Sequence, residues 1–387
     1  MAVAQLWNVI PLDQHGQSAV GSDLVVMVDD RNTEAQKFPR QTKSHHVMEK
    51  IILPILFSLA VAICRAAEPY HFIKEIPIGG EGGWDYLSVD PAAHRLYVSH
   101  ATEIVVIDLN SDKIVGEITN TPGVHGIAIS DDLGLGVTSN GREDKAGIVD
   151  LKTLQTLSKV DTAEGPDGFV YDPGQMEAYL FCGRAQAATV VDVKAAKAVA
   201  TIPLGGQPEF ATVDPEAGRV YDNLENKSEV AVIDTKTHQV VNRWQIAPGE
   251  SASGMAIDVA HNRLFIGCHN RKMVMMDNTN GKVLATVPIG EGVDACRFDP
   301  GTQLAFASCG DGTTTIAKEE SPDKLTIVQT LKTERGARTM ALDPSTHKIY
   351  LATAKFGAQP ESANGERRRR PPMIPGTFKI LVYGMDK

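Results

Sequence analysis

Short stretches in which hydrophobic and polar residues alternate run through most of the chain after about residue 70. One part of the chain shows three in succession, Arg95–Ser99, Ile104–Asp108 and Lys113–Ile118. Successive side chains of a strand point to opposite faces, so this alternation predicts β-strands. Asp, Asn, Gly and Pro separate the stretches, as tight turns require. No part holds a 3.6-residue period long enough for a helix, and the pattern therefore predicts an all-β fold.

A turn that most often reads Asp-Pro returns at a nearly constant interval. Its seven occurrences begin at Asp90, Ser130, Asp172, Asp214, Asp258, Asp299 and Asp343. The steps between them are 40, 42, 42, 44, 41 and 44 residues. Four short strands per period of about 40–45 residues is the pattern of a β-propeller blade. We therefore predict a seven-bladed β-propeller with four-stranded blades.

The two ends of the repeated region complement each other. The last unit supplies three strands, the third of them over Phe378–Tyr383, and the chain then stops. A fourth strand is available upstream of the first unit, at Tyr70–Ile76. We predict that this N-terminal strand completes the last blade and closes the ring.

The third strand of most units ends in an aspartate. These residues are Asp108, Asp150, Asp192, Asp234 and Asp277. Because they recur once per blade, we interpret them as turn caps and not as chemical groups. The sixth unit departs from the pattern, since Thr315–Lys318 replaces the apolar run that ends in Asp. This departure weakens the prediction of a third strand there.

The repeated units resemble those of the YVTN-repeat (YncE-like) β-propeller family. The resemblance is carried by units such as Arg95–Ser99 followed by Val105–Leu109, and it covers about residues 70–387. It implies an exported propeller, in a family whose biochemical role is often undefined. It implies no catalytic motif that could be carried over to this chain.

An export signal precedes the repeats. Met48-Glu49-Lys50 is followed by an apolar run, Ile51–Ile63, and then by small residues, which is the order of a secretory signal peptide. The run is shorter than the roughly 20 residues of a membrane span; an internal buried strand or helix is the alternative. We therefore divide the chain into a disordered or mis-annotated leader (1–47), a signal peptide (48–67) and a propeller (68–387) that is periplasmic or secreted and has no transmembrane segment.

Composition narrows the function. The formal net charge of −10 argues against general binding of nucleic acids, and no specific nucleic-acid signature is present. The chain has no P-loop, G-x-S-x-G or H-E-x-x-H motif and no Cys-x-x-Cys pair. Cys296 and Cys309, on neighbouring strands of one hairpin, form the single disulfide we consider. We expect a monomer.

Charged residues recur where each inner strand begins, five positions before the anchor. They form the series Asp85, His125, Asp167, Glu209, Ser253, Asp294 and Arg338. His100 ends a second strand at the same side of the ring. Six members of the series can carry charge, and such a ring could hold a divalent cation or orient a polar ligand, with Arg338 contacting a carboxylate or phosphate. The alternative is that these side chains are solvated turn residues.

A long insertion separates the second and third strands of the last unit. It covers 355–377 and contains Arg367, Arg368, Arg369 and Arg370. Loops of this length inside a compact domain are usually functional or disordered. Two interpretations stay open, a basic lid over the acidic ring and a mobile solvated loop.

The favoured function is a ligand-binding or protein-interaction scaffold without catalysis. The candidate ligand-binding residues are Asp85, His100, His125, Asp167, Glu209, Asp294 and Arg338. The alternative is a metal-dependent hydrolase or lactonase that uses the carboxylates at the channel mouth. Tight convergence of these carboxylates with a histidine would favour the enzyme, and a wide ring would favour binding. The partner is an unidentified protein or small polar ligand, and a divalent cation is the one cofactor that the ring suggests.

Overall fold

The computed structural model describes residues 69–358 and 371–386. The predicted leader (1–47), the signal peptide (48–67) and Arg367–Arg370 lie outside these residues. Within them the regular structure is β-strand apart from one short 3₁₀ turn, Glu225–Lys227. In the same ranges no helix has the length and apolar character needed to cross a membrane.

The N-terminal strand β1 and the strands of the first four repeats follow the predicted order. They are β1 His71–Pro77, β2 Leu87–Asp90, β3 Arg95–His100, β4 Glu103–Asp108, β5 Lys113–Ile118, β6 Val124–Ser130, β7 Leu135–Asn140, β8 Lys145–Asp150, β9 Gln155–Asp161, β10 Pro166–Asp172, β11 Glu177–Cys182, β12 Ala187–Asp192, β13 Lys197–Pro203, β14 Pro208–Asp214, β15 Arg219–Leu224, β16 Glu229–Asp234 and β17 Gln239–Gln245.

The last three repeats continue in the same way. They contribute β18 Ala252–Asp258, β19 Arg263–Cys268, β20 Lys272–Asp277, β21 Val283–Pro288, β22 Val293–Asp299, β23 Leu304–Cys309, β24 Thr313–Ser321, β25 Lys324–Lys332, β26 Met340–Asp343, β27 Lys348–Thr353 and β28 Lys379–Gly384.

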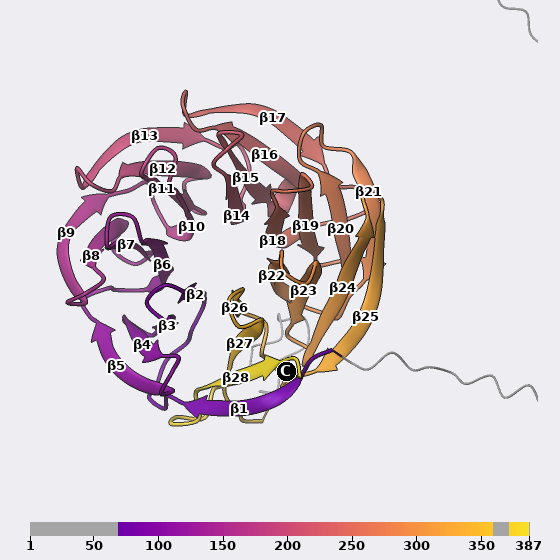
Figure 1. The fold of residues 1–387 in the computed structure, drawn as a ribbon. Helices are drawn as coiled ribbons and strands as arrows, with labels where there is room; N and C mark the ends of the chain where they lie inside the picture. The colour runs from indigo at the N-terminus through magenta and orange to yellow at the C-terminus, as the bar shows by residue number, and fades with distance from the viewer. Residues whose placement is uncertain (1–68, 359–370, 387) are drawn as a thin grey trace, which may run out of the picture. The chain divides into compact units, whose positions relative to one another are not determined.

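These strands form seven four-stranded antiparallel sheets arranged as a ring within the described residues, which confirms the β-propeller (Figure 1). The first strand of each blade lies next to the centre and the fourth at the rim. The last blade has the order β1-β28-β27-β26, so the N-terminal strand completes it as predicted. β1 pairs with β28 from His71 opposite Gly384 to Pro77 opposite Lys379.

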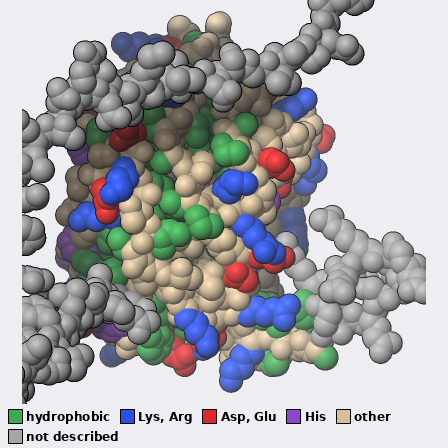
Figure 2. Space-filling model, turned by 90° about the vertical axis from the view of Figure 1, so that its right-hand side faces the viewer, with side chains coloured by type: hydrophobic (Ala, Val, Ile, Leu, Met, Phe, Trp, Pro, Cys, Tyr) green, Lys and Arg blue, Asp and Glu red, His purple; other side chains and the backbone are tan. Residues whose placement is uncertain are grey.

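Burial follows the position of a strand in its blade. The second and third strands are buried on both faces because each blade packs against two neighbours, and one apolar cluster joins Tyr179 and Phe181 of the third blade to Val220 and Ile233 of the fourth. The rim strands leave alternate side chains exposed. On the flank that carries β21 and β25, charged side chains of both signs are scattered among polar and apolar ones (Figure 2).

The aspartates that end third strands cap turns, as predicted. Asp108 Oδ1 accepts the backbone N–H of Ser111 at 2.7 Å, and Asp150 Oδ1 accepts that of Thr153 at 2.7 Å. A carboxylate that accepts a backbone N–H three residues ahead fixes the tight turn between two strands. The recurrence of these residues is therefore explained by folding alone.

The sixth blade is the exception. It does have a third strand, β24, but β24 and β25 are nine residues long, whereas the third strand of the fifth blade, β20, has six. The suggested Cys296–Cys309 disulfide is wrong, since both thiols are free and buried. Cys296 is opposite Ala307 and Cys309 is opposite Val293, so the two cysteines are not cross-strand partners and instead fill apolar space.

Candidate functional site

The predicted ring residues gather at one end of the ring, which we call the mouth. All inner strands run in the same direction, because each blade repeats the same topology. Their first residues therefore share one end of the ring, and their last residues share the other end, which we call the base. His125, Asp167, Glu209 and Asp294 lie at or near the starts of β6, β10, β14 and β22. Repeat equivalence alone thus places these side chains together.

Asp85, His125 and Asp167 form a compact group, the mouth triad. His125 Nδ1 lies 2.7 Å from Asp85 Oδ2 and 3.2 Å from Asp167 Oδ1. Burial lowers the pKa of His125, but the hydrogen bond to Asp85 and the charge of Asp167 outweigh it and raise the pKa overall. Burial also raises the pKa of Asp167, and the charge of Asp85 adds to that effect. A charged imidazole between two carboxylates is the arrangement that these contacts favour.

The remaining ring residues form separate contacts. Arg338 Nε lies 3.2 Å from Asp294 Oδ2. Burial, together with the charges of Asp167 and Glu225, raises the pKa of Glu209 to about 9. The predicted ring is therefore divided into local groups and does not converge on one point.

Glu225 and His269 join the mouth beside Glu209. Glu225 Oε1 lies 3.4 Å from His269 Nε2, and this contact lowers the pKa of Glu225 and raises that of His269. Glu225 begins the 3₁₀ turn after β15. Its equivalents in three other blades are Gly141, Gly183 and Gly310, so no recurrent charge marks this position, and repeat reasoning missed Glu225.

Aromatic side chains meet below the mouth and form what we call the aromatic floor. The ring of Tyr86 lies 5.2 Å from those of Phe169 and Phe210, and the Arg297 guanidinium lies 4.7 Å from the centre of Phe210. Burial raises the pKa of Tyr86 well above its usual range, and the charges of Asp167, Asp85, Glu209 and Asp294 raise it further. These carboxylates thus surround the floor. In the sequence the same aromatic residues read as ordinary core positions of inner strands.

A cavity of about 650 Å³ opens at the mouth beside the sixth and seventh blades. Its lining includes Trp84, His269, Arg335, Arg338, Phe356 and Met373. The Trp84 ring stacks on Phe378 at 4.9 Å, which holds it in place as one wall. Glu81 and Asp294 line it as well, so the cavity combines charged groups of both signs with an aromatic surface.

His100 lies apart from the other candidate residues. It is only 4% exposed and stacks on Phe378 at 4.7 Å, and burial lowers its pKa. Among the described residues, no hydrogen bond or ion pair joins it to the rest of the predicted ring. The sequence placed His100 at the correct strand end but could not show that Phe378, far along the chain, covers it.

Comparison with known proteins identifies structures of similar fold. No protein-family model matches the chain, and no curated protein matches it. The structure resembles Kuenenia stuttgartiensis hydrazine synthase, with a TM-score of 0.63 and 16% identity, over 72% of this chain and 94% of that chain. It also resembles a chain in the crystal structure of a mitotic checkpoint complex, with a TM-score of 0.66 and 12% identity, over 82% of this chain and 95% of that chain. At these identities the likeness shows that the chain is a β-propeller and does not show its activity.

Proposed function

We propose that the chain is an exported, YVTN-type propeller that binds an organic anion at its mouth. The observation that carries this proposal is the cavity of about 650 Å³ at the mouth. Its size lies within the range of pockets that hold small molecules. Export is supported by the signal-peptide pattern of residues 48–67, and the YVTN type by the repeat pattern from residue 70 onward.

Charge selects the ligand. Arg335 lines the cavity with His269, whose pKa is raised by its contact with Glu225. Arg338 is paired with Asp294, and Glu81 is the other acid of the lining. Arg335 is exposed and forms no ion pair with another described residue. An arginine in this state offers a planar fork of N–H donors that matches a carboxylate or phosphate group.

The apolar surface of the cavity indicates the uncharged part of the ligand. Trp84, Phe356 and Met373 form one side of the cavity, and Trp84 is stacked on Phe378. Preformed aromatic walls favour a flat apolar group, because little freedom is lost when they are covered. The ligand is therefore an anion attached to an aromatic or other flat apolar group. It could be a small metabolite or the carboxylate end of a protein chain.

Calorimetry with matched probes tests this proposal. Indole-3-acetate should bind, whereas indole-3-acetamide, which has the same shape without the charge, should bind at least about tenfold more weakly. Arg335→Ala should weaken binding of the acetate by a similar factor. Arg184→Ala is the matched control, because Arg184 is an exposed arginine near the start of β12, at the same end of the ring but away from the cavity.

Two further probes separate the sources of the anion. Phenyl phosphate tests the phosphate group, and a tryptophan-terminated peptide with a free or amidated end tests a protein carboxylate. Selective binding of the free peptide would assign a protein partner. Equal binding of charged and uncharged probes, or no effect of Arg335→Ala, would contradict the proposal.

One observation favours a second candidate, metal-assisted hydrolysis. The ligand atoms of Asp85, His125 and Asp167 lie within 4.8 Å of one another. A metal held there would activate a water molecule as nucleophile. We rank this candidate lower because His125 already contacts both carboxylates. Ester or lactone turnover that a chelator and His125→Ala both abolish would reverse that ranking.

A further inference from the structure

The sixth blade extends its outer hairpin toward the fifth blade at the base. In the fifth blade the third strand ends at Asp277, which is paired with Arg263. The equivalent residue of the sixth blade is Lys318, paired with Leu304, and here β24 continues for three more residues. Glu319 is the first of these additional residues, and it is buried between the exposed Lys318 and Glu320.

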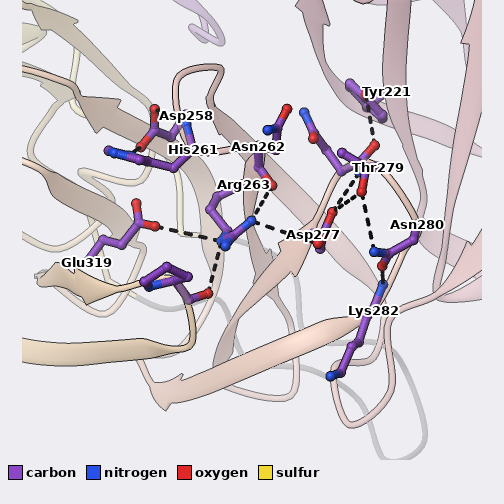
Figure 3. A network of polar contacts seen from close by, with 12 residues as sticks. Tyr221, Asp258, His261, Asn262, Arg263, Asp277, Thr279, Asn280, Lys282 and Glu319 are labelled. Carbon is purple, nitrogen blue, oxygen red and sulfur yellow. Dashed lines mark hydrogen bonds and ion pairs between the residues drawn. The ribbon is translucent and has the colours of Figure 1, made fainter.

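The tip of this hairpin is fastened to the fifth blade. Arg263 Nε donates a hydrogen bond to the Pro322 backbone oxygen at 3.0 Å, and Arg263 Nη1 donates to the Asn262 backbone oxygen at 2.9 Å. Asp258 is the last residue of β18, and His261 lies in the turn between β18 and β19. The extension therefore places the Glu319 carboxylate over the β18–β19 turn (Figure 3).

Asp258 and His261 form a local pair. Asp258 Oδ2 lies 2.6 Å from His261 Nδ1, and Asp258 Oδ1 accepts the Ala260 backbone N–H at 3.0 Å. The Asp258 carboxylate is buried, whereas the His261 side chain is 48% exposed. One side of the pair is thus open to solvent.

Glu319 is only partly satisfied by its protein neighbours, since Arg263 is near one of its oxygens and no described residue bonds the other. The residue is 6% exposed, and its Oε2 atom has no hydrogen-bond partner among the described residues. Its Oε1 atom lies 3.8 Å from Arg263 Nε, which is too long for a hydrogen bond. A buried carboxylate oxygen without a partner is costly, and a second buried carboxylate beside it adds repulsion. The arrangement needs a cationic or proton-bearing occupant.

We propose that Asp258, His261 and Glu319, the base cluster, bind a divalent transition-metal ion of the Zn²⁺ or Mn²⁺ class. Each residue offers one ligand atom, and these atoms lie within 4.8 Å of one another. Metal–ligand distances for zinc are about 2.0–2.2 Å, so small side-chain rotations bring all three to one ion. An imidazole nitrogen beside two carboxylates suits zinc or manganese, whereas calcium and magnesium prefer oxygen ligands alone.

The surroundings fit this ion. Arg263 is the nearest cation, and its charge is shared, because Nε lies 3.8 Å from Glu319 Oε1 and Nη1 lies 4.0 Å from Asp277 Oδ2. The exposed side of His261 gives the ion a route of entry and space for water ligands. Bound there, the metal would link the fifth blade to the hairpin of the sixth.

Zinc calorimetry on the chelator-stripped full chain tests the proposal. Glu319→Gln and His261→Ala should each remove one binding site, or weaken it at least about tenfold. His347→Ala is the control, because His347 Nδ1, in the β26–β27 turn of the seventh blade, lies 2.7 Å from Asp299 Oδ2 at the end of β22 in the sixth blade, with no third ligand within reach among the described residues. His125→Ala shows whether any of the zinc is bound at the mouth triad and not at the base cluster.

A spectroscopic readout reports the ligands directly. With Co²⁺ in place of zinc, the visible absorption bands of the bound ion should be present in the wild-type protein and in His347→Ala. They should be lost in Glu319→Gln and His261→Ala, while circular dichroism shows that both variants are folded. Zinc binding that is absent in the wild-type protein, or unchanged in both variants, would overturn the proposal and leave a proton shared by the two carboxyl groups. Neither result depends on binding of organic anions at the mouth.

Discussion

Two clusters, each with one histidine and two carboxylic acids, lie at opposite ends of the ring. In the mouth triad the side chains of Asp85, His125 and Asp167 are 26%, 32% and 39% exposed. In the base cluster the carboxylates of Asp258 and Glu319 are only 3% and 5% exposed. The chemical groups are the same, two carboxylates and one imidazole, but the environments differ.

The two histidines also differ in the number of carboxylates that they contact. His125 lies between its two acids and contacts both of them, so a protonated imidazole balances the mouth triad. His261 contacts Asp258 alone and leaves Glu319 Oε2 without a partner. Water reaches the partly exposed triad, whereas the carboxylates of the base cluster are almost fully buried. Composition therefore does not decide whether a cluster requires a ligand; burial and hydrogen bonding do.

The largest expected effect is on thermal stability at the base cluster. Zinc at one hundred times its dissociation constant should stabilise the wild-type protein by about 2.7 kcal/mol, because it binds the folded state alone. Glu319→Gln should abolish this gain and, without metal, should leave the protein no less stable than the wild type, since it removes a buried charge. Melting curves with zinc or with chelator provide the measurement. A Glu319→Gln protein that zinc stabilises as much as the wild type would erase the distinction between the clusters.

The second prediction concerns the mouth triad. His125→Ala leaves Asp85 and Asp167 facing each other without a cation and should cost about 1 kcal/mol, the upper range for partly exposed ion pairs. Because the pKa of His125 is raised in the folded protein, its contribution is complete below the unfolded value of about 6.5 and is lost as the pH rises through the folded pKa. Urea unfolding of both proteins between pH 6 and pH 9 should show the difference shrinking as pH rises. A difference that grows with pH would contradict the charged triad.

The fold and the mouth were predictable for the same reason. Strand alternation is local, and seven equivalent turns place equivalent residues at one end of a ring, so Asp85, His125 and Asp167 could be grouped from the sequence alone. Glu319 could not be placed in this way, because it lies beyond the repeat pattern on a longer hairpin. The sequence marked that exception only through Lys318, where an aspartate was expected. Repeats predict what the blades share, and a site formed by one exceptional blade needs the three-dimensional packing.

The smallest expected effect belongs to the pair Asp299 and His347, a carboxylate–imidazole contact between the sixth and seventh blades that has no third acid within reach among the described residues. Asp299 Oδ1 accepts the Gly301 backbone N–H at 3.0 Å, and Oδ2 accepts the Thr302 hydroxyl at 2.9 Å. The buried carboxylate therefore keeps partners when the imidazole is removed, and His347→Ala should cost less than about 1 kcal/mol.

His261→Ala completes this comparison at the base. In the absence of metal, His261→Ala should lower the free energy of unfolding more than His347→Ala does. The reason is that the buried Asp258 carboxylate then loses its imidazole partner and still lies beside the Glu319 carboxylate. Paired urea titrations in chelator would measure both. Equal losses would show that Glu319 does not interact with Asp258, and the base cluster would then be three neighbouring side chains without a common ligand. The alternative outcome is a larger loss of stability for His261→Ala that Glu319→Gln removes in the double variant. It would identify the repulsion between the two carboxylates as the cause.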